Sequence, residues 1–76
     1  MMKIDLKLFA TFAKYLPEDN ENFEVSENTS VNKLISELGI EQNAVKLIFV
    51  NGKIKDGEYI LKNSDRLGLF PPVGGG

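Results

Sequence analysis

A single helix pattern in the middle of the chain most constrains what it can fold into. Ser30 is a good helix N-cap, and the apolar residues after it recur at helical positions i, i+3, i+4 and i+7. These residues are Val31, Leu34, Ile35 and Leu38. Gly39 follows at the C′ position, where glycine ends many helices, and Ile40 can fold back on the last turn. One main helix is therefore expected, with strands before and after it.

The chain before this helix is predicted to form two strands. Residues 3–10 alternate apolar and charged side chains, as a strand with one buried face does. Phe9 is out of phase and falls on the side of the charged residues. Residues 11–17 favour a short helical segment that ends at Pro17. A short strand at residues 23–26 is expected to pair back on the first strand.

The chain after the helix is predicted to be mostly strand. Residues 44–50 are apolar on both faces, which is typical of a central strand. Asn51-Gly52 indicates a type I′ hairpin turn into a short strand at residues 53–55. Residues 59–61 favour one helical turn, and the last strand is expected at residues 67–70.

This order of elements predicts an α+β domain of the β-grasp (ubiquitin-like) type. We expect a mixed sheet of four to five strands, with the main helix on one face and the other face uncovered. Residues 1–70 would form this domain, and residues 71–76 a flexible C-terminal tail of sequence Pro-Pro-Val-Gly-Gly-Gly.

The uncovered face is predicted to carry apolar side chains. Strand phase places Val45, Leu47 and Phe49 against the helix. The apolar residues expected on the outward side are Phe9, Ile48, Val50, Ile54 and Phe70. Since an exposed apolar patch on a small protein usually marks a binding site, we expect Phe9, Ile48, Ile54 and Phe70 to contact a partner.

Composition excludes several kinds of chemistry. The 76 residues contain no cysteine and no histidine, so the chain lacks a thiolate nucleophile and the commonest general base and metal ligand. We therefore expect no metal site and no bound cofactor. A net charge of −2 without a basic cluster argues against nucleic-acid binding. The first twenty residues read as a strand rather than a signal or membrane span, so a cytoplasmic location is expected.

The C-terminal sequence Phe70-Pro71-Pro72-Val73-Gly74-Gly75-Gly76 is the main candidate site. Prolines cannot donate to a sheet, and glycines can pass through a channel too narrow for side chains. Six extended residues would reach roughly 20 Å, far enough to act inside another protein. The alternative is an ordinary disordered terminus. A carboxylate must be activated before transfer, so an ATP-using enzyme would have to adenylate Gly76.

Several segments together resemble the MoaD/ThiS family of sulfur carriers along essentially the whole chain. They are Phe9-Ala10-Thr11-Phe12, Asn51-Gly52, Ser64-Asp65 and the terminal Phe-Pro-Pro-Val-Gly-Gly-Gly. The Phe-Pro-Pro-Val step is typical of the small subunits of molybdopterin synthase. Where the family often has Gly-Asp before the last strand, this chain has Ser64-Asp65, which affects only a turn.

The resemblance implies a carrier that is not an enzyme by itself. A cognate E1-like enzyme would adenylate Gly76 with ATP, and a persulfide donor would convert the carboxylate to a thiocarboxylate. The tail, including Gly74 and Gly75, would insert into the large subunit of molybdopterin synthase, in a heterotetramer, and deliver sulfur to a pterin precursor. Family members contact partners through residues that match Phe9, Ile54 and Phe70.

Two other functions share this chemistry up to the adenylate. The chain could supply sulfur for thiazole or for thiolated tRNA. It could instead be a ubiquitin-like modifier that is joined to lysines of target proteins through Gly76. The Phe70-Pro71-Pro72-Val73 sequence favours the molybdopterin pathway.

Overall fold

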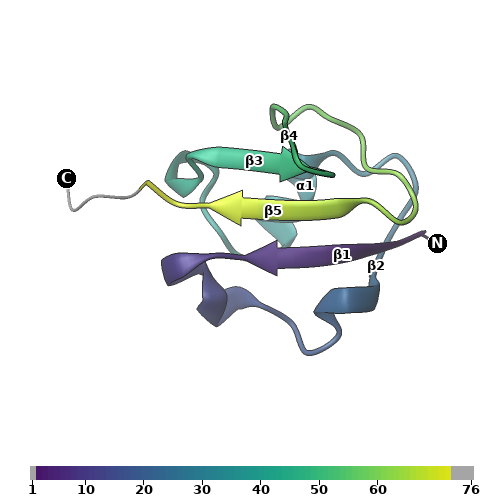
Figure 1. Cartoon of the computed structure of the whole chain (residues 1–76), viewed down its shortest axis with the longest axis horizontal. Helices are drawn as coiled ribbons and strands as arrows, with labels where there is room; N and C mark the ends of the chain where they lie inside the picture. Colours follow the sequence, from purple (N-terminus) through teal and green to yellow (C-terminus); the bar gives the residue numbers. More distant parts are fainter. Residues whose placement is uncertain (1, 73–76) are drawn as a thin grey trace.

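The computed structural model describes residues 2–72, which form a five-stranded sheet with one α-helix (Figure 1). The strands are β1 (Met2–Leu8), β2 (Phe23–Val25), β3 (Leu47–Val50), β4 (Lys53–Ile54) and β5 (Arg66–Phe70), and the helix is α1 (Val31–Glu37). Three short 3-10 helices complete the described elements: η1 (Ala10–Tyr15), η2 (Asn20–Asn22) and η3 (Gln42–Ala44).

The sheet has the strand order β2-β1-β5-β3-β4. The first and last strands pair in parallel at its centre, with Asp5 opposite Arg66 and Leu8 opposite Leu69. The other three pairings are antiparallel. A mixed sheet with one main helix confirms the predicted α+β arrangement.

Helix α1 begins and ends as its sequence predicts. The Ser30 hydroxyl accepts a hydrogen bond from the Lys33 backbone N–H at 3.1 Å. At the other end Gly39 has a φ of +84°, which glycine adopts without steric cost. The Gly39 N–H donates to the Ser36 carbonyl and the Ile40 N–H to the Ile35 carbonyl, which is the Schellman pattern.

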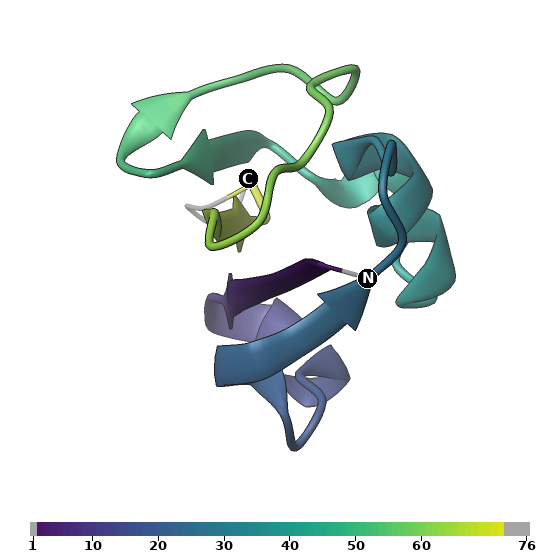
Figure 2. The same ribbon diagram turned by 90° about the vertical axis from the view of Figure 1, so that its right-hand side faces the viewer.

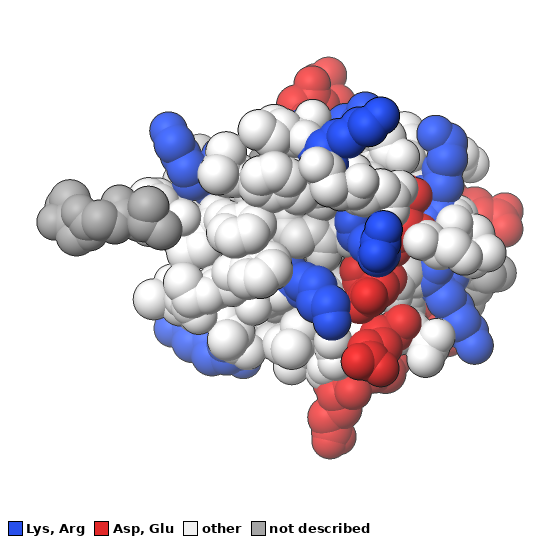
Figure 3. All heavy atoms as spheres, viewed as in Figure 1, with Lys and Arg blue, Asp and Glu red and all other residues white. Residues whose placement is uncertain are grey.

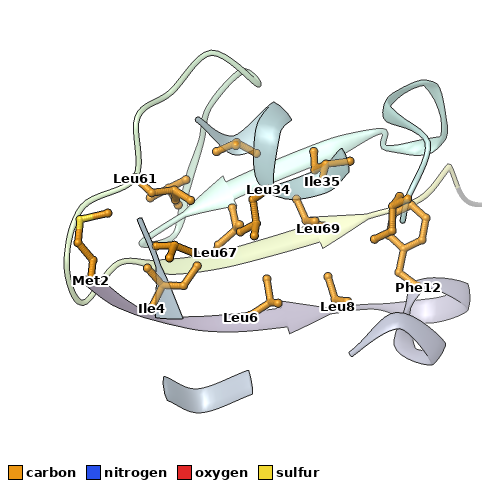
Figure 4. Close-up of a cluster of buried hydrophobic side chains, with 14 residues drawn as sticks. Met2, Ile4, Leu6, Leu8, Phe12, Leu34, Ile35, Leu61, Leu67 and Leu69 are labelled. Carbon is orange, nitrogen blue, oxygen red and sulfur yellow. The ribbon is translucent and has the colours of Figure 1, made fainter. Parts of the chain in front are cut away.

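The core lies between helix α1 and one face of the sheet, as Figure 2 shows from the side. The most completely buried side chains include Leu6 on β1, Leu34 on α1 and Leu67 on β5 (Figure 4). Phe12 of η1 closes the core near the end of β1. The opposite face of the sheet, which we call the open face, has no helix over it in the described chain (Figure 2).

The segment before β5 differs from the prediction. Residues 59–61 form no helical turn; Ile60 instead makes a β-bridge with Ser30. The Leu61 N–H donates to the Thr29 carbonyl and the Val31 N–H to the Tyr59 carbonyl, both at 2.9 Å. Pairing with the chain that enters α1 therefore keeps this segment extended.

Two strand boundaries differ from those that the sequence predicts. Strand β1 ends at Leu8 because Ala10, with a φ of +54°, starts η1. In β5 the strand begins one residue earlier than expected, at Arg66. Across residues 2–72, no helix has both the length and the apolar character that crossing a membrane would need.

Candidate functional site

Three phenylalanines meet on the open face, and we call them the aromatic cluster. They are Phe9, directly after β1, Phe49 of β3 and Phe70 at the end of β5. The rings of Phe9 and Phe70 are stacked, with centroids 4.1 Å apart and planes 5° from parallel. The Phe49 ring meets Phe70 edge to face at 5.3 Å. The predicted outward position of Phe9 is confirmed, since its side chain is 40% exposed outside the core.

Sheet register extends the apolar surface beyond the cluster. Ile54 of β4 lies opposite Phe49, and Leu47 of β3 lies opposite Phe70. Directly opposed residues share a face of the sheet, so both side chains lie on the open face. Ile54 is 65% exposed, which confirms its predicted orientation. The aromatic cluster therefore has apolar neighbours on the β3–β4 side.

A hollow of about 350 Å³ opens beside the aromatic cluster, and we call it the Gly68 hollow. Its lining residues are Lys7, Phe9, Phe49, Gly52, Arg66, Leu67, Gly68 and Phe70. Gly68 lies between Phe49 and Lys7 in the sheet register. A Cβ atom on Gly68 would lie 3.3 Å from Cε2 of Phe9, so a side chain here would crowd the ring.

The charges around the hollow are mainly positive. Lys7 and Arg66 both lie on its rim. The Lys7 Nζ atom is 3.7 Å from Oδ1 of Asp5, so the two side chains form an ion pair. This distance is too long for a hydrogen bond, and Asp5 Oδ1 has no hydrogen-bond partner. Figure 3 shows the open face, with an uncharged area over the C-terminal ends of β1 and β5 and acidic side chains toward the other end.

The chain leaves the sheet next to the aromatic cluster. The Phe70 carbonyl accepts a hydrogen bond from the Lys46 N–H at 2.8 Å, and the Leu69 carbonyl accepts one from the Phe9 N–H at 3.2 Å. Pro71 is buried and Pro72 is exposed. The last strand is therefore held on both sides up to the point of exit. The predicted site residues Val73, Gly74, Gly75 and Gly76 lie outside the described residues.

The predicted outward orientation of Ile48 and Val50 is wrong. Val50 is 2% exposed in the core, and Ile48 is partly buried against it. Strand β3 is therefore shifted by one residue in phase, and Phe49 takes the outward position that had been given to Ile48. In a two-residue turn at Asn51-Gly52, residues 49 and 54 are paired and share a face. An outward Ile54 thus already required an outward Phe49.

The sequence prediction also missed two positions of the site. Leu47 was placed against the helix, but it is 37% exposed on the open face. The sequence pattern predicts only a strand position for Gly68, yet its backbone forms the floor of the hollow. The signal for Gly68 was a glycine at a position in β5 where an outward side chain would otherwise stand.

The side chains around the aromatic cluster are apolar apart from Lys7 and Arg66. Within residues 2–72, no three potential metal-ligating side chains come together. Asp65, a buried carboxylate, accepts hydrogen bonds from Asn51, Tyr59 and the Lys62 backbone, so it serves the fold. The candidate site on the described chain is therefore an exposed apolar surface beside the chain exit.

Comparisons with known proteins agree with the β-grasp fold. The family model described as the ThiS family matches residues 6–76. A candidate molybdopterin converting factor subunit 1 from Pyrococcus furiosus is 30% identical, with a TM-score of 0.72. The match covers 96% of this chain and 100% of that one. No match was found among curated protein sequences.

Two further solved structures are similar. One is a complex of subunits 1 and 2 of the molybdopterin-converting factor from Helicobacter pylori 26695, with 26% identity and a TM-score of 0.57. That match covers 99% of this chain and 100% of that one. The small archaeal modifier protein 1 of H. volcanii is 20% identical with a TM-score of 0.70, over 96% and 100% of the two chains, and shows the shared fold.

Proposed function

Since the chain belongs to the ThiS family, we propose that it serves as the small subunit of a molybdopterin synthase. The chain is a ubiquitin-like sulfur carrier of the ThiS/MoaD type. The choice of pathway is supported by 30% identity to the Pyrococcus furiosus protein and by the sequence Phe70-Pro71-Pro72-Val73.

The observation that carries the proposal is the position of the aromatic cluster at the chain exit. Phe70 is part of the aromatic cluster and also of the chain exit. Its ring stacks on Phe9, and its carbonyl accepts a sheet hydrogen bond from the Lys46 N–H directly before the tail. A partner that binds the cluster is thereby positioned where residues 71–76 begin. Docking and delivery of the C-terminus then occur on one protein surface.

The reacting atom in this proposal is the carboxylate carbon of Gly76. A carboxylate resists nucleophiles, so an E1-like enzyme first joins it to AMP with ATP as the donor, and pyrophosphate leaves. The terminal sulfur of a persulfide donor then attacks the acyl carbon and AMP leaves, which gives an acyl disulfide. A thiol acts as the reductant: it attacks the donor's sulfur and breaks the S–S bond, which leaves a thiocarboxylate on Gly76 and a disulfide on the donor side. Because Gly74 and Gly75 have no side chains, the tail suits a narrow active site. This chain contributes no catalytic residue of its own to these steps.

The proposed partner is a large synthase subunit. The H. pylori structure is a complex of subunits 1 and 2, which supports an equivalent assembly here, built as a heterotetramer. In it, the sulfur on Gly76 would pass to a pterin precursor held by the large subunit. Cytoplasmic enzymes would carry out both loading and transfer.

Intact mass spectrometry tests sulfur loading. The chain is incubated with a cognate E1-like enzyme, ATP and a persulfide donor. We expect an oxygen-to-sulfur mass increase confined to the C-terminal peptide. A chain that lacks Gly76 should show no increase while giving the same far-ultraviolet circular dichroism spectrum, because β5 ends at Phe70.

Binding to a purified large subunit tests the pathway. We expect Phe9→Ala to lower the affinity about tenfold or more, since an exposed aromatic residue at an interface often contributes over 1.4 kcal/mol. Lys33→Ala on helix α1 is the matched control and should bind like the unaltered chain. A carrier that loads sulfur but does not bind the large subunit would contradict the molybdopterin pathway.

The same incubation distinguishes a protein modifier from a sulfur carrier. If lysine-linked conjugates of Gly76 accumulate and no thiocarboxylate forms, the chain is a protein modifier and the proposed sulfur transfer is wrong. Loading with sulfur and no conjugates supports the carrier function.

A further inference from the structure

We propose that the Gly68 hollow receives one large apolar side chain of a protein partner, and that carboxylates beside this side chain pair with Arg66 and Lys7. The inference rests on the proposed carrier function for the identity of the natural partner. The chemistry of the contact itself follows from the hollow and can be tested without that partner.

The sheet register shows why the hollow lies above Gly68. Ile54, Phe49, Gly68 and Lys7 stand in one row across four neighbouring strands. Every member of this row except Gly68 projects a side chain. Since strands lie about 4.8 Å apart, the backbones at Phe49 and Lys7 are separated by about 10 Å, and Gly68 adds no side chain between them. The edge of the Phe9 ring borders this space, 3.3 Å from where a Cβ atom of Gly68 would lie.

The walls of the hollow favour an apolar occupant. Phe9 and Phe70 form one end as a stacked pair, and Phe49 meets Phe70 edge to face. The floor is the backbone of Gly68, which is buried at the bottom of the hollow. A large apolar side chain placed here would be removed from water and would also cover the exposed part of Phe9, and both effects favour binding.

The rim adds a requirement for negative charge. No acidic residue lines the hollow within the described chain, whereas Arg66 and Lys7 do. One acidic side chain lies beside the rim: Asp5 is 3.7 Å from Lys7 Nζ and opposite Arg66 in the register. One carboxylate cannot neutralise two cations. The chain carries a net charge of −2, so this positive rim is local and would orient a partner that presents carboxylates there.

Peptide probes test the chemistry without reference to any pathway. The ¹⁵N-labelled full chain is titrated with three blocked tripeptides: Asp-Leu-Asp, Lys-Leu-Lys and Asp-Ala-Asp. We expect Asp-Leu-Asp to shift the amide signals of Gly68, Phe49 and Lys7. Two exposed ion pairs should make its affinity about threefold to tenfold higher than that of Lys-Leu-Lys. Asp-Ala-Asp should bind more weakly, because its small side chain leaves the hollow unfilled.

Three variants test whether the peptide binds in the Gly68 hollow. Gly68→Ala places a methyl group against the Phe9 ring and narrows the hollow, and Gly68→Val narrows it further. Both should reduce binding of Asp-Leu-Asp, the valine variant more strongly. Arg66→Glu should remove the preference for the acidic peptide. Lys33→Glu on helix α1 changes the net charge by the same amount and should leave the preference intact. Dispersed amide spectra verify that each variant is folded; if Gly68→Val unfolds, Gly68→Ala and Arg66→Glu carry the test.

The outcomes separate the two proposals. Equal binding of the acidic and basic peptides, or shifts located away from Gly68, overturns the hollow inference. The same holds if Arg66→Glu behaves like Lys33→Glu. If the acidic peptide binds the hollow but a purified large subunit does not bind the chain, the inference stands and the proposed synthase function fails.

Discussion

The carboxylate of Asp65 shows how one buried side chain connects three segments of this fold. Oδ1 accepts a hydrogen bond from the Asn51 side chain at 2.9 Å, and Oδ2 accepts one from the Lys62 N–H at 2.8 Å and one from the Tyr59 hydroxyl at 3.2 Å. Asn51 in turn accepts from the Arg66 N–H through its side-chain oxygen. The hairpin turn after β3 is thereby tied to the start of β5.

We predict that Asp65→Asn lowers the free energy of unfolding by about 1–3 kcal/mol. The asparagine side chain has the same shape but only one acceptor oxygen. Its NH₂ group would therefore face one of the donors that the Asp65 carboxylate now accepts from, and that hydrogen bond would be lost. Urea unfolding followed by circular dichroism measures the loss. The control is Asp56→Asn, at an exposed carboxylate that accepts from the Glu58 N–H. Asparagine can make the same bond there, so a loss as large as at position 65 would contradict the account.

Residue identity alone did not reveal the importance of Asp65. The sequence placed it in a turn, and turns usually expose their carboxylates to water. Its burial depends on Asn51 and Tyr59, which lie on two other segments. Such a network forms only in three dimensions, so local pattern could not predict it.

At the scale of elements, helix α1 was predictable because its signals are local. The Ser30 cap, the apolar stripe and Gly39 all lie within ten residues of one another. Strand β3 was harder, because it is apolar on both faces and alternation cannot set its phase. The register of the β3–β4 hairpin decides that Phe49, and not Ile48, faces outward.

We predict that Ser30→Ala lowers the free energy of unfolding by about 1 kcal/mol, because the Lys33 N–H loses its acceptor. A helix of seven residues has few other hydrogen bonds to compensate. The matched control is Ser36→Ala in the same helix, where an exposed position gains helix propensity and stability should stay equal or rise slightly. Thermal unfolding of both variants measures the difference. Equal midpoints for the two would show that the cap contributes nothing.

On the scale of the whole molecule, the parallel pair of β1 and β5 is the structural centre. These strands have neighbours on both sides, whereas β2 and β4 are edges. Leu6, Leu67 and Leu69 of this pair are fully buried. The candidate site is built on the ends of the same strands, since Phe9 follows β1 and Phe70 ends β5.

We predict that amides of β1 and β5 exchange most slowly with deuterium, and that those of β4 exchange fastest among the strands. Slow exchange requires opening of the most extensively buried part of a fold. Hydrogen exchange read by NMR on the full chain measures this. Slower exchange in the β3–β4 hairpin than in β1 would show that the hairpin, not the central pair, is the most stable unit.

The pairing of β1 with β5 also has a kinetic consequence for the aromatic cluster. Asp5 lies opposite Arg66, so this strand pairing closes nearly the longest loop that the described chain can form. Contacts of such long range cost the most chain entropy and tend to slow folding. Phe9 and Phe70 cannot stack until that closure is complete. The stacked pair therefore exists only in chains in which β1 and β5 have already come together.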